Sequence, residues 1–87
     1  SDLMIRKLNK KDQEILNTLG SIWLNSNIAT HNFINEEYWV NNYDNVIESF
    51  KTAEIIVYEK NTEIIGFCGL IDNYIAGMFI KKSSRNQ

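Results

Sequence analysis

The residues of this chain that could do chemistry gather toward its C-terminal end. Lys81, Lys82 and Arg85 stand close together there, and no aspartate or glutamate follows Asp72. A basic turn after an apolar strand favours an anion, because unpaired N–H groups at the turn and at the start of a following helix add to the charge of the side chains. A solvated basic tail is the alternative that charge alone leaves open.

A glycine in the strand before this turn is the second feature of interest. Gly77 lies within the apolar run that precedes Lys81. Glycine weakens the interior of a strand, so its presence there often marks a bulge or a close approach of another group to the backbone. A bulge would turn backbone N–H and C=O groups toward a ligand lying along the strand. Packing of an aromatic ring against the glycine is the alternative.

Few other side chains suit catalysis or metal binding. His31 is the one histidine, and because imidazole titrates near neutral pH, it is the candidate for a catalytic proton transfer; a structural loop residue is the alternative. Cys68 is the one cysteine and lies in an apolar run, which predicts a buried, reduced thiol. One histidine and one distant cysteine do not form a metal site, so we expect no metal.

Length and composition limit the class of protein. A chain of 87 residues allows one domain, and 44% hydrophobic with 23% charged residues is ordinary for a globular protein. The net charge of −2 gives no general attraction to nucleic acid or acidic lipid, and we expect neither as a partner. No apolar stretch approaches the roughly 20 residues of a membrane span, and a reduced thiol favours the cytoplasm. Residues 1–3, which precede Met4, have the character of an expression scar.

The first part of the chain predicts a strand followed by a helix. Residues 3–8 alternate weakly as a strand, with Met4, Arg6 and Leu8 on one side. Asn9 is a typical N-cap, and Asp12 three residues later completes a variant of the capping box. A helix over residues 10–25 would bury a stripe at helical spacing: Ile15, Leu16, Leu19, Ile22 and Trp23. Gly20 weakens this helix by about 1 kcal/mol relative to alanine, which close packing against a neighbour would explain.

The rest of the chain predicts a second helix and three strands. Residues 26–34 read as a loop or broken helix, after which Asn35 caps a helix with Glu36 and Glu37 at its positive end. Strands are expected at residues 53–58, 63–71 and 74–80, and the short turns between them require antiparallel neighbours. The prediction is an α+β fold of order β-α-α-β-β-β, a mainly antiparallel four-stranded sheet covered by two helices.

This order of elements, with two sequence segments, resembles the first half of the GNAT superfamily of N-acetyltransferases. The segments are Glu63-Ile-Ile-Gly-Phe-Cys-Gly-Leu70 and Ile75-Ala-Gly-Met-Phe-Ile-Lys-Lys-Ser-Ser-Arg-Asn-Gln87. In that family the fourth strand ends in an apolar triplet and leads into an R/Q-x-x-G-x-G/A loop that binds the pyrophosphate of coenzyme A. Arg85, Asn86 and Gln87 match the first three loop positions. The resemblance implies that residues 1–87 are a single partial domain, the N-terminal half of an α/β GNAT-like fold truncated within this motif and inactive alone.

The resemblance also implies site residues. Met78, Phe79 and Ile80 match the triplet whose backbone pairs with the pantetheine arm of acetyl-CoA and polarises the acetyl carbonyl through a fixed N–H group. The implied cofactor-binding residues are Met78, Phe79, Ile80, Arg85, Asn86 and Gln87. The run Ala29-Thr30-His31-Asn32-Phe33 is similar to that of a bacterial subgroup of small GNAT enzymes. In this comparison Trp23, His31 and Phe33 match positions that border the pocket for the acceptor amine.

The implied reaction is direct attack of an amine on acetyl-CoA, which requires a base for the ammonium proton and an acid for the leaving thiolate. In the family the acid is commonly a tyrosine of the later half. The general base is unassigned, with His31 as the one candidate, and the acceptor could be an amino acid, a polyamine, an antibiotic or a protein terminus. A different class of function is a small α+β interaction domain that pairs with a partner protein, or with a second copy as a homodimer, through the exposed edge of the strand at residues 74–80.

Overall fold

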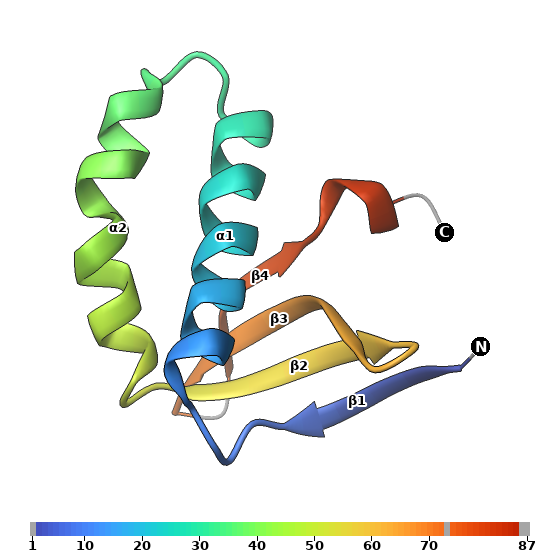
Figure 1. Ribbon diagram of the computed structural model, residues 1–87. Coiled ribbons are helices and arrows are strands. Elements are labelled where there is room, and N and C mark those ends of the chain that lie inside the picture. Colours follow the sequence, from blue (N-terminus) through green and yellow to red (C-terminus); the bar gives the residue numbers. More distant parts are fainter. Residues whose placement is uncertain (1, 73, 86–87) are drawn as a thin grey trace.

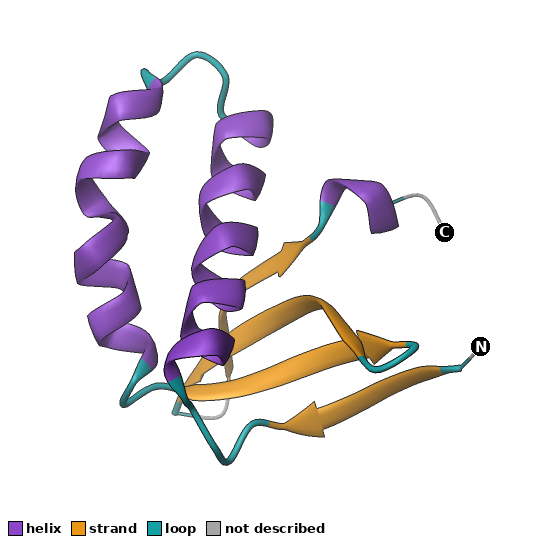
Figure 2. Cartoon of the chain, in the orientation of Figure 1, coloured by secondary structure: helices purple, strands orange, loops and turns teal. Residues whose placement is uncertain are grey.

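The computed structural model describes residues 2–72 and 74–85. Its elements in chain order are β1 (Leu3–Lys7), α1 (Gln13–Thr30), α2 (Glu36–Phe50), β2 (Glu54–Lys60), β3 (Glu63–Ile71), β4 (Tyr74–Ile80) and the 3₁₀ turn η1 (Lys82–Ser84). The four strands form one antiparallel sheet in the order β1-β2-β3-β4, and both helices lie on one of its faces (Figure 1; Figure 2). The predicted α+β fold of order β-α-α-β-β-β is therefore confirmed.

The core lies between the helices and the central strands. Ile55 and Val57 of β2 alternate toward the helices, and Phe67 of β3 stands directly opposite Val57. Because side chains of a strand alternate between faces, these positions bury one side of the sheet against the helical stripes. The buried hydrophobic cluster consists of Leu8, Leu16, Leu19, Ile22, Trp23, Ile47, Phe50, Ile55, Val57 and Phe67. Among the described residues, no helix combines the length and apolar character needed to cross a membrane.

Helix α1 begins and ends later than the sequence pattern predicted. Its N-cap is Asp12, whose Oδ1 accepts the N–H of Ile15 at 2.9 Å, so the expectation of a cap at Asn9 was wrong. The helix also continues through the predicted loop as far as Thr30. Ser26 and Asn27 are buried there, because they extend the inward stripe beyond Trp23 at helical spacing.

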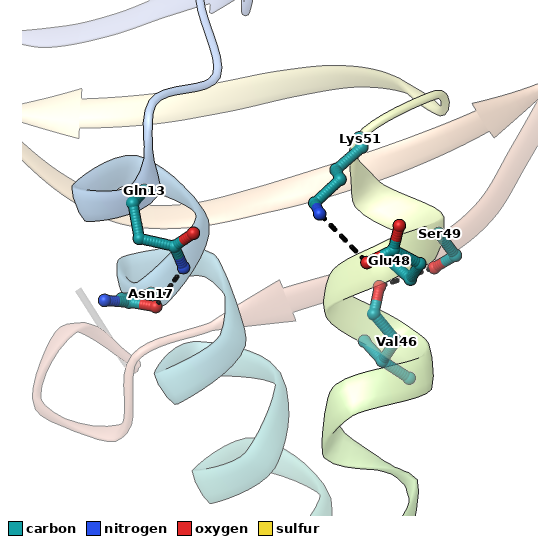
Figure 3. Close-up of polar contacts among 6 residues, drawn as sticks. All are labelled: Gln13, Asn17, Val46, Glu48, Ser49 and Lys51. Atoms are coloured by element: carbon teal, nitrogen blue, oxygen red, sulfur yellow. Dashed lines mark hydrogen bonds and ion pairs between the residues drawn. The ribbon is translucent and has the colours of Figure 1, made fainter.

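Helix α2 follows the prediction closely. Asn35 is its N-cap, with the side-chain Oδ1 accepting the N–H of Glu37 at 2.8 Å. At its other end Lys51 lies 2.9 Å from the carboxylate of Glu48, and the Ser49 hydroxyl donates to the carbonyl of Val46 at 2.6 Å (Figure 3). A lysine after the last turn also complements the negative end of the helix. Being exposed, this ion pair stabilises the helix by only a few tenths of a kcal/mol.

The start of α1 carries a comparable contact on its surface. The amide of Gln13 donates to Oδ1 of Asn17 at 2.8 Å, one turn further along (Figure 3). Pairs at this spacing stabilise a helix by roughly 0.2–0.5 kcal/mol. The first turn of α1 thus depends more on the Asp12 cap than on this surface contact.

The two helices touch at Gly20, as the sequence suggested. A Cβ atom at this position would lie 2.5 Å from Cδ1 of Ile47 and 2.6 Å from the hydroxyl oxygen of Tyr43. Both distances are far below van der Waals contact. The glycine therefore allows α2 to approach α1, and this contact explains its place in the middle of a helix.

We predict that Gly20→Ala lowers the free energy of unfolding by about 1 kcal/mol. Overpacking against Ile47 and Tyr43 destabilises by about 1–3 kcal/mol, and the better helix propensity of alanine offsets about 1 kcal/mol of it. Urea denaturation followed by circular dichroism measures the change. Ser21→Ala, at the exposed neighbouring position, is the control and should leave stability unchanged or slightly higher. A more stable Gly20→Ala protein would contradict the close helix contact.

We also predict that Asp12→Ala lowers the free energy of unfolding by about 1 kcal/mol, the usual effect of removing an N-cap. Asn9→Ala should have no measurable effect, because residue 9 lies outside the helix. Thermal and urea denaturation of the two variants compares the two candidate caps directly. The assignment of the cap to Asp12 fails if Asn9→Ala proves the more damaging change.

Candidate functional site

Strand β4 contains a bulge. Gly77 pairs with Gly69 and Ile75 pairs with Leu70, so Ala76 has no partner on β3. One extra residue bends a strand and interrupts its ladder. A Cβ on Gly77 would also lie 3.0 Å from the ring of Phe79. The bulge expected near Gly77 is confirmed, and so is the alternative of an aromatic ring packed against this glycine.

The outer edge of β4 presents backbone groups that no described strand pairs with, because β4 is the last strand of the sheet. The N–H of Lys81 donates to the carbonyl of Ile65 on β3 at 2.8 Å. Alternate residues of an antiparallel strand direct their backbone groups to opposite edges. Met78 and Ile80 therefore direct their N–H and C=O groups away from β3.

The carbonyl of Ile80 already has two donors. The hydroxyl of Ser26, which is buried on α1, donates to it at 3.1 Å, and Nε of Arg85 donates at 3.2 Å. The predicted phosphate ligand Arg85 thus folds back onto the end of β4. Ser26 was not predicted to contribute here, although it lies three residues after Trp23 and so continues the buried stripe of α1. Asn86 and Gln87, also predicted to bind the cofactor, lie outside the described residues.

A hollow of about 390 Å³ lies between α1 and the C-terminal turn. Lys81 and Lys82 contribute to its lining, and Lys81 forms an ion pair with Glu63. Within residues 2–72 and 74–85, Lys82 has no ion-pair partner. The hollow therefore offers one uncompensated positive charge beside the end of β4. Its lining residues are Ser21, Ile22, Asn25, Ser26, Lys81, Lys82 and Ser83.

An apolar cleft of similar volume, about 390 Å³, opens on the helix-covered side of the bulge. This volume falls within the range of ligand pockets. Its floor includes Gly69, Ala76 and Gly77, and no charged side chain is found in its described lining. Three phenylalanine rings, one from α2 and two from the sheet, lie next to one another in its walls. The ring of Phe67 lies 5.3 Å from that of Phe79 and 5.3 Å from that of Phe50, between centroids.

The three predicted acceptor residues are only partly brought together. Trp23 is buried and lines the apolar cleft. Its ring centroid lies 5.8 Å from Trp39, on which His31 stacks at 5.6 Å. Phe33 is 80% exposed and contacts His31 edge-on at 6.1 Å. His31 and Phe33 thus lie at the loop between the helices and are not part of the cleft lining.

Cys68 is buried and free, as predicted, and lies one residue from the cleft floor. It interacts with Tyr58 on the neighbouring strand. A hydrogen bond with Cys68, followed by burial, raises the pKa of Tyr58 to about 12. Such a phenol stays protonated at neutral pH, and neither group faces the cleft lining.

The comparisons with known proteins identify a shared fold. No protein-family model matches the chain, and no curated protein matches it. The solved structure of apo-form YjaB from Escherichia coli, determined in solution, is similar to 98% of this chain with a TM-score of 0.77 and 26% sequence identity. The chain spans 56% of the length of that YjaB chain.

These findings correct the family assignment made from the sequence. The identification of the chain as the N-terminal half of a GNAT acetyltransferase, truncated within the pyrophosphate motif, was wrong, because no family model supports it. The residues before the supposed motif form the turn η1, and Arg85 returns to the carbonyl of Ile80. What the comparisons establish is an α+β fold shared with YjaB along nearly the whole chain.

Proposed function

We propose that this protein is an N-acetyltransferase that moves the acetyl group of acetyl-CoA to an amine. The observation that carries the proposal is the bulge at Ala76 in a strand whose outer edge is unpaired among the described residues, directly beside an apolar cleft. Acetyl transfer needs a rigid backbone that orients a thioester and a separate space from which an amine approaches it. Both requirements meet at one point of β4.

The edge of β4 suits an extended pantetheine arm. The arm carries amide groups that can pair with a strand edge as an added strand would. Met78 offers both an N–H and a C=O group, whereas Ile80 offers its N–H because its carbonyl is occupied by Ser26 and Arg85. A fixed backbone N–H stabilises the negative charge that develops on the acetyl oxygen during transfer. The thioester would then lie next to the bulge.

The phosphates of the coenzyme would lie toward the C-terminal turn. Lys82 and Arg85 supply positive charge there, in line with β4, and Lys81 is partly neutralised by Glu63. The roles of Asn86 and Gln87 stay predictions. The backbone of Phe79 is turned toward β3, where it pairs with Phe67, so Phe79 would not pair with the pantetheine arm. Its ring packs against Phe67 and Gly77 in the cleft.

The chemical step balances without a further reactant. The amine nitrogen attacks the carbonyl carbon of the thioester, a C–N bond forms and the C–S bond breaks. The departing thiolate takes up a proton to become the coenzyme thiol, and the nitrogen loses its proton to a base. His31 stays the candidate base from the sequence, although it is exposed and lies outside the cleft lining.

We predict that acetyl-CoA shifts the backbone amide resonances of β4. Titration of the ¹⁵N-labelled chain with acetyl-CoA should move the amides of Gly77, Met78 and Ile80, and pantetheine, which lacks phosphates, should move the same amides at higher concentration. Arg85→Ala should weaken acetyl-CoA about tenfold, equivalent to about 1.4 kcal/mol, and leave pantetheine unchanged.

The matched control is Lys10→Ala, which removes one positive charge from the loop before α1. It should change neither titration. The proposal is overturned if millimolar acetyl-CoA leaves every amide of β4 in place. An equal loss of acetyl-CoA affinity in Arg85→Ala and in Lys10→Ala would show that binding responds to net charge and not to a phosphate contact.

The same edge supports a second candidate function, association with another copy of the chain. Tyr74–Ile80 contains neither a charged residue nor proline. Natural edge strands usually carry such residues, because they prevent pairing with other chains. Two β4 edges could pair antiparallel about a two-fold axis and extend the sheet across both copies.

Analytical ultracentrifugation over a range of protein concentrations tests this second candidate. We predict a dimer at high concentration and a monomer for Ile75→Lys, because a lysine on the edge opposes pairing. Val40→Lys is the control, since Val40 on α2 is 54% exposed, the same fraction as Ile75. A strict monomer at every concentration removes this candidate and leaves the acetyltransferase proposal untouched.

A further inference from the structure

We infer that the apolar cleft recognises the acceptor by an uncharged apolar group, an aromatic ring or a branched alkyl chain, attached to its primary amine. This inference rests on the proposed function, because it names the substrate class of the same site. It separates the acceptor classes that the sequence left open, and it excludes polyamines and multiply charged antibiotics.

The chemistry of the lining carries the argument. Removing a charged ammonium group from water is strongly unfavourable unless a carboxylate or several acceptors replace the water. Among the described residues of the lining there is no carboxylate, and the side-chain oxygens are those of Ser49 and Thr52. The Ser49 hydroxyl donates back to the carbonyl of Val46 at 2.6 Å (Figure 3). The interior of the cleft is thus suited to apolar groups.

The aromatic walls provide the attraction for such a group. Phe50, Phe67 and Phe79 form a continuous row of edge-on and tilted ring contacts, with Trp23 on the helix side. An aromatic ring packed edge-on or offset against such rings gains about 0.5–1.5 kcal/mol beyond its burial. A ligand ring of the same size would extend this row.

Gly69 creates the space that the ligand would fill. It faces the helices on β3, two residues after the buried Phe67, and a Cβ at this position would meet no atom within 4 Å. The other two sheet glycines differ, because a Cβ on Gly66 would lie 2.8 Å from the carbonyl oxygen of Phe79 and one on Gly77 would lie 3.0 Å from the ring of Phe79. A larger side chain at Gly69 would therefore reduce the volume of the cleft without disturbing the packing of the sheet.

The cleft also points its occupant at the reacting atoms of the proposed function. Ala76 and Gly77 line it at the bulge. An apolar group held among the phenylalanine rings would leave its amine at the open side of the cleft, next to the thioester position on β4. Gly69 and the phenylalanine rings would thus determine specificity.

The inference is tested by direct binding without coenzyme, using 2-phenylethylamine, isoamylamine and spermidine as probes. Both apolar amines should shift the amide resonances of Gly69, Ala76 and Phe79, and spermidine should leave them in place. Gly69→Val should weaken 2-phenylethylamine at least about tenfold, because the added methyl groups occupy the cleft. Ala29→Val, on the exposed surface of α1, creates the same valine side chain by adding two methyl groups to an existing Cβ, and it should change nothing.

Two further measurements separate the possible failures. Thermal unfolding of Gly69→Val and of the smaller Gly69→Ala confirms that the variants fold, and acetyl-CoA titration of Gly69→Val should still shift the β4 amides. The inference is overturned if spermidine shifts the cleft residues as strongly as the apolar amines, or if Gly69→Val binds 2-phenylethylamine like the unchanged protein. Loss of acetyl-CoA shifts with intact binding of the apolar amines would instead overturn the proposed function alone.

Discussion

One extra residue in β4 determines which side chains of this strand face the helices beside the candidate site. Ala76 has no partner on β3, so the pairing changes by one residue between Gly77 and Ile75. In an uninterrupted ladder Ile75 would oppose Ile71 and face the helices, because side chains of a strand alternate with a period of two. The bulge moves Ile75 to the other face, opposite Leu70. Tyr74 takes the place opposite Ile71 instead, and the same bulge bends the free edge of the strand.

The sequence predicted those features that depend on local pattern. Asn35 as a cap, the contact at Gly20, the buried thiol of Cys68 and the bulge near Gly77 each follow from what one residue type can do in one setting. The start of α1 did not follow, because Asn9 and Asp12 are both good caps and only the packed structure chooses between them. Its end was also misjudged, since the polar Ser26 continues a stripe that looked finished at Trp23.

The candidate site was predictable in its location but not in its shape. Gly77 identified β4 as the strand of interest, because a glycine inside a strand often marks a bulge or a close approach of another group to the backbone. The cleft could not be foreseen, since Trp23 and Phe50 have the same helical spacing whether they fill a core or border an opening. His31 and Phe33 were grouped with Trp23 through a resemblance, and the stack on Trp39 keeps both at the loop between the helices. The family assignment rested on the order of elements and two sequence segments, and no family model supports it.

The bond between Ser26 and the carbonyl of Ile80 ties the middle of the helical layer to the end of the edge strand. Because Ser26 is buried and fixed within α1, the end of β4 cannot swing outward unless this bond breaks or the helix follows. The end of β4 and α1 are therefore expected to move together. Hydrogen exchange of the Lys81 amide, which donates to the carbonyl of Ile65 at the end of β4, should therefore report on the integrity of α1.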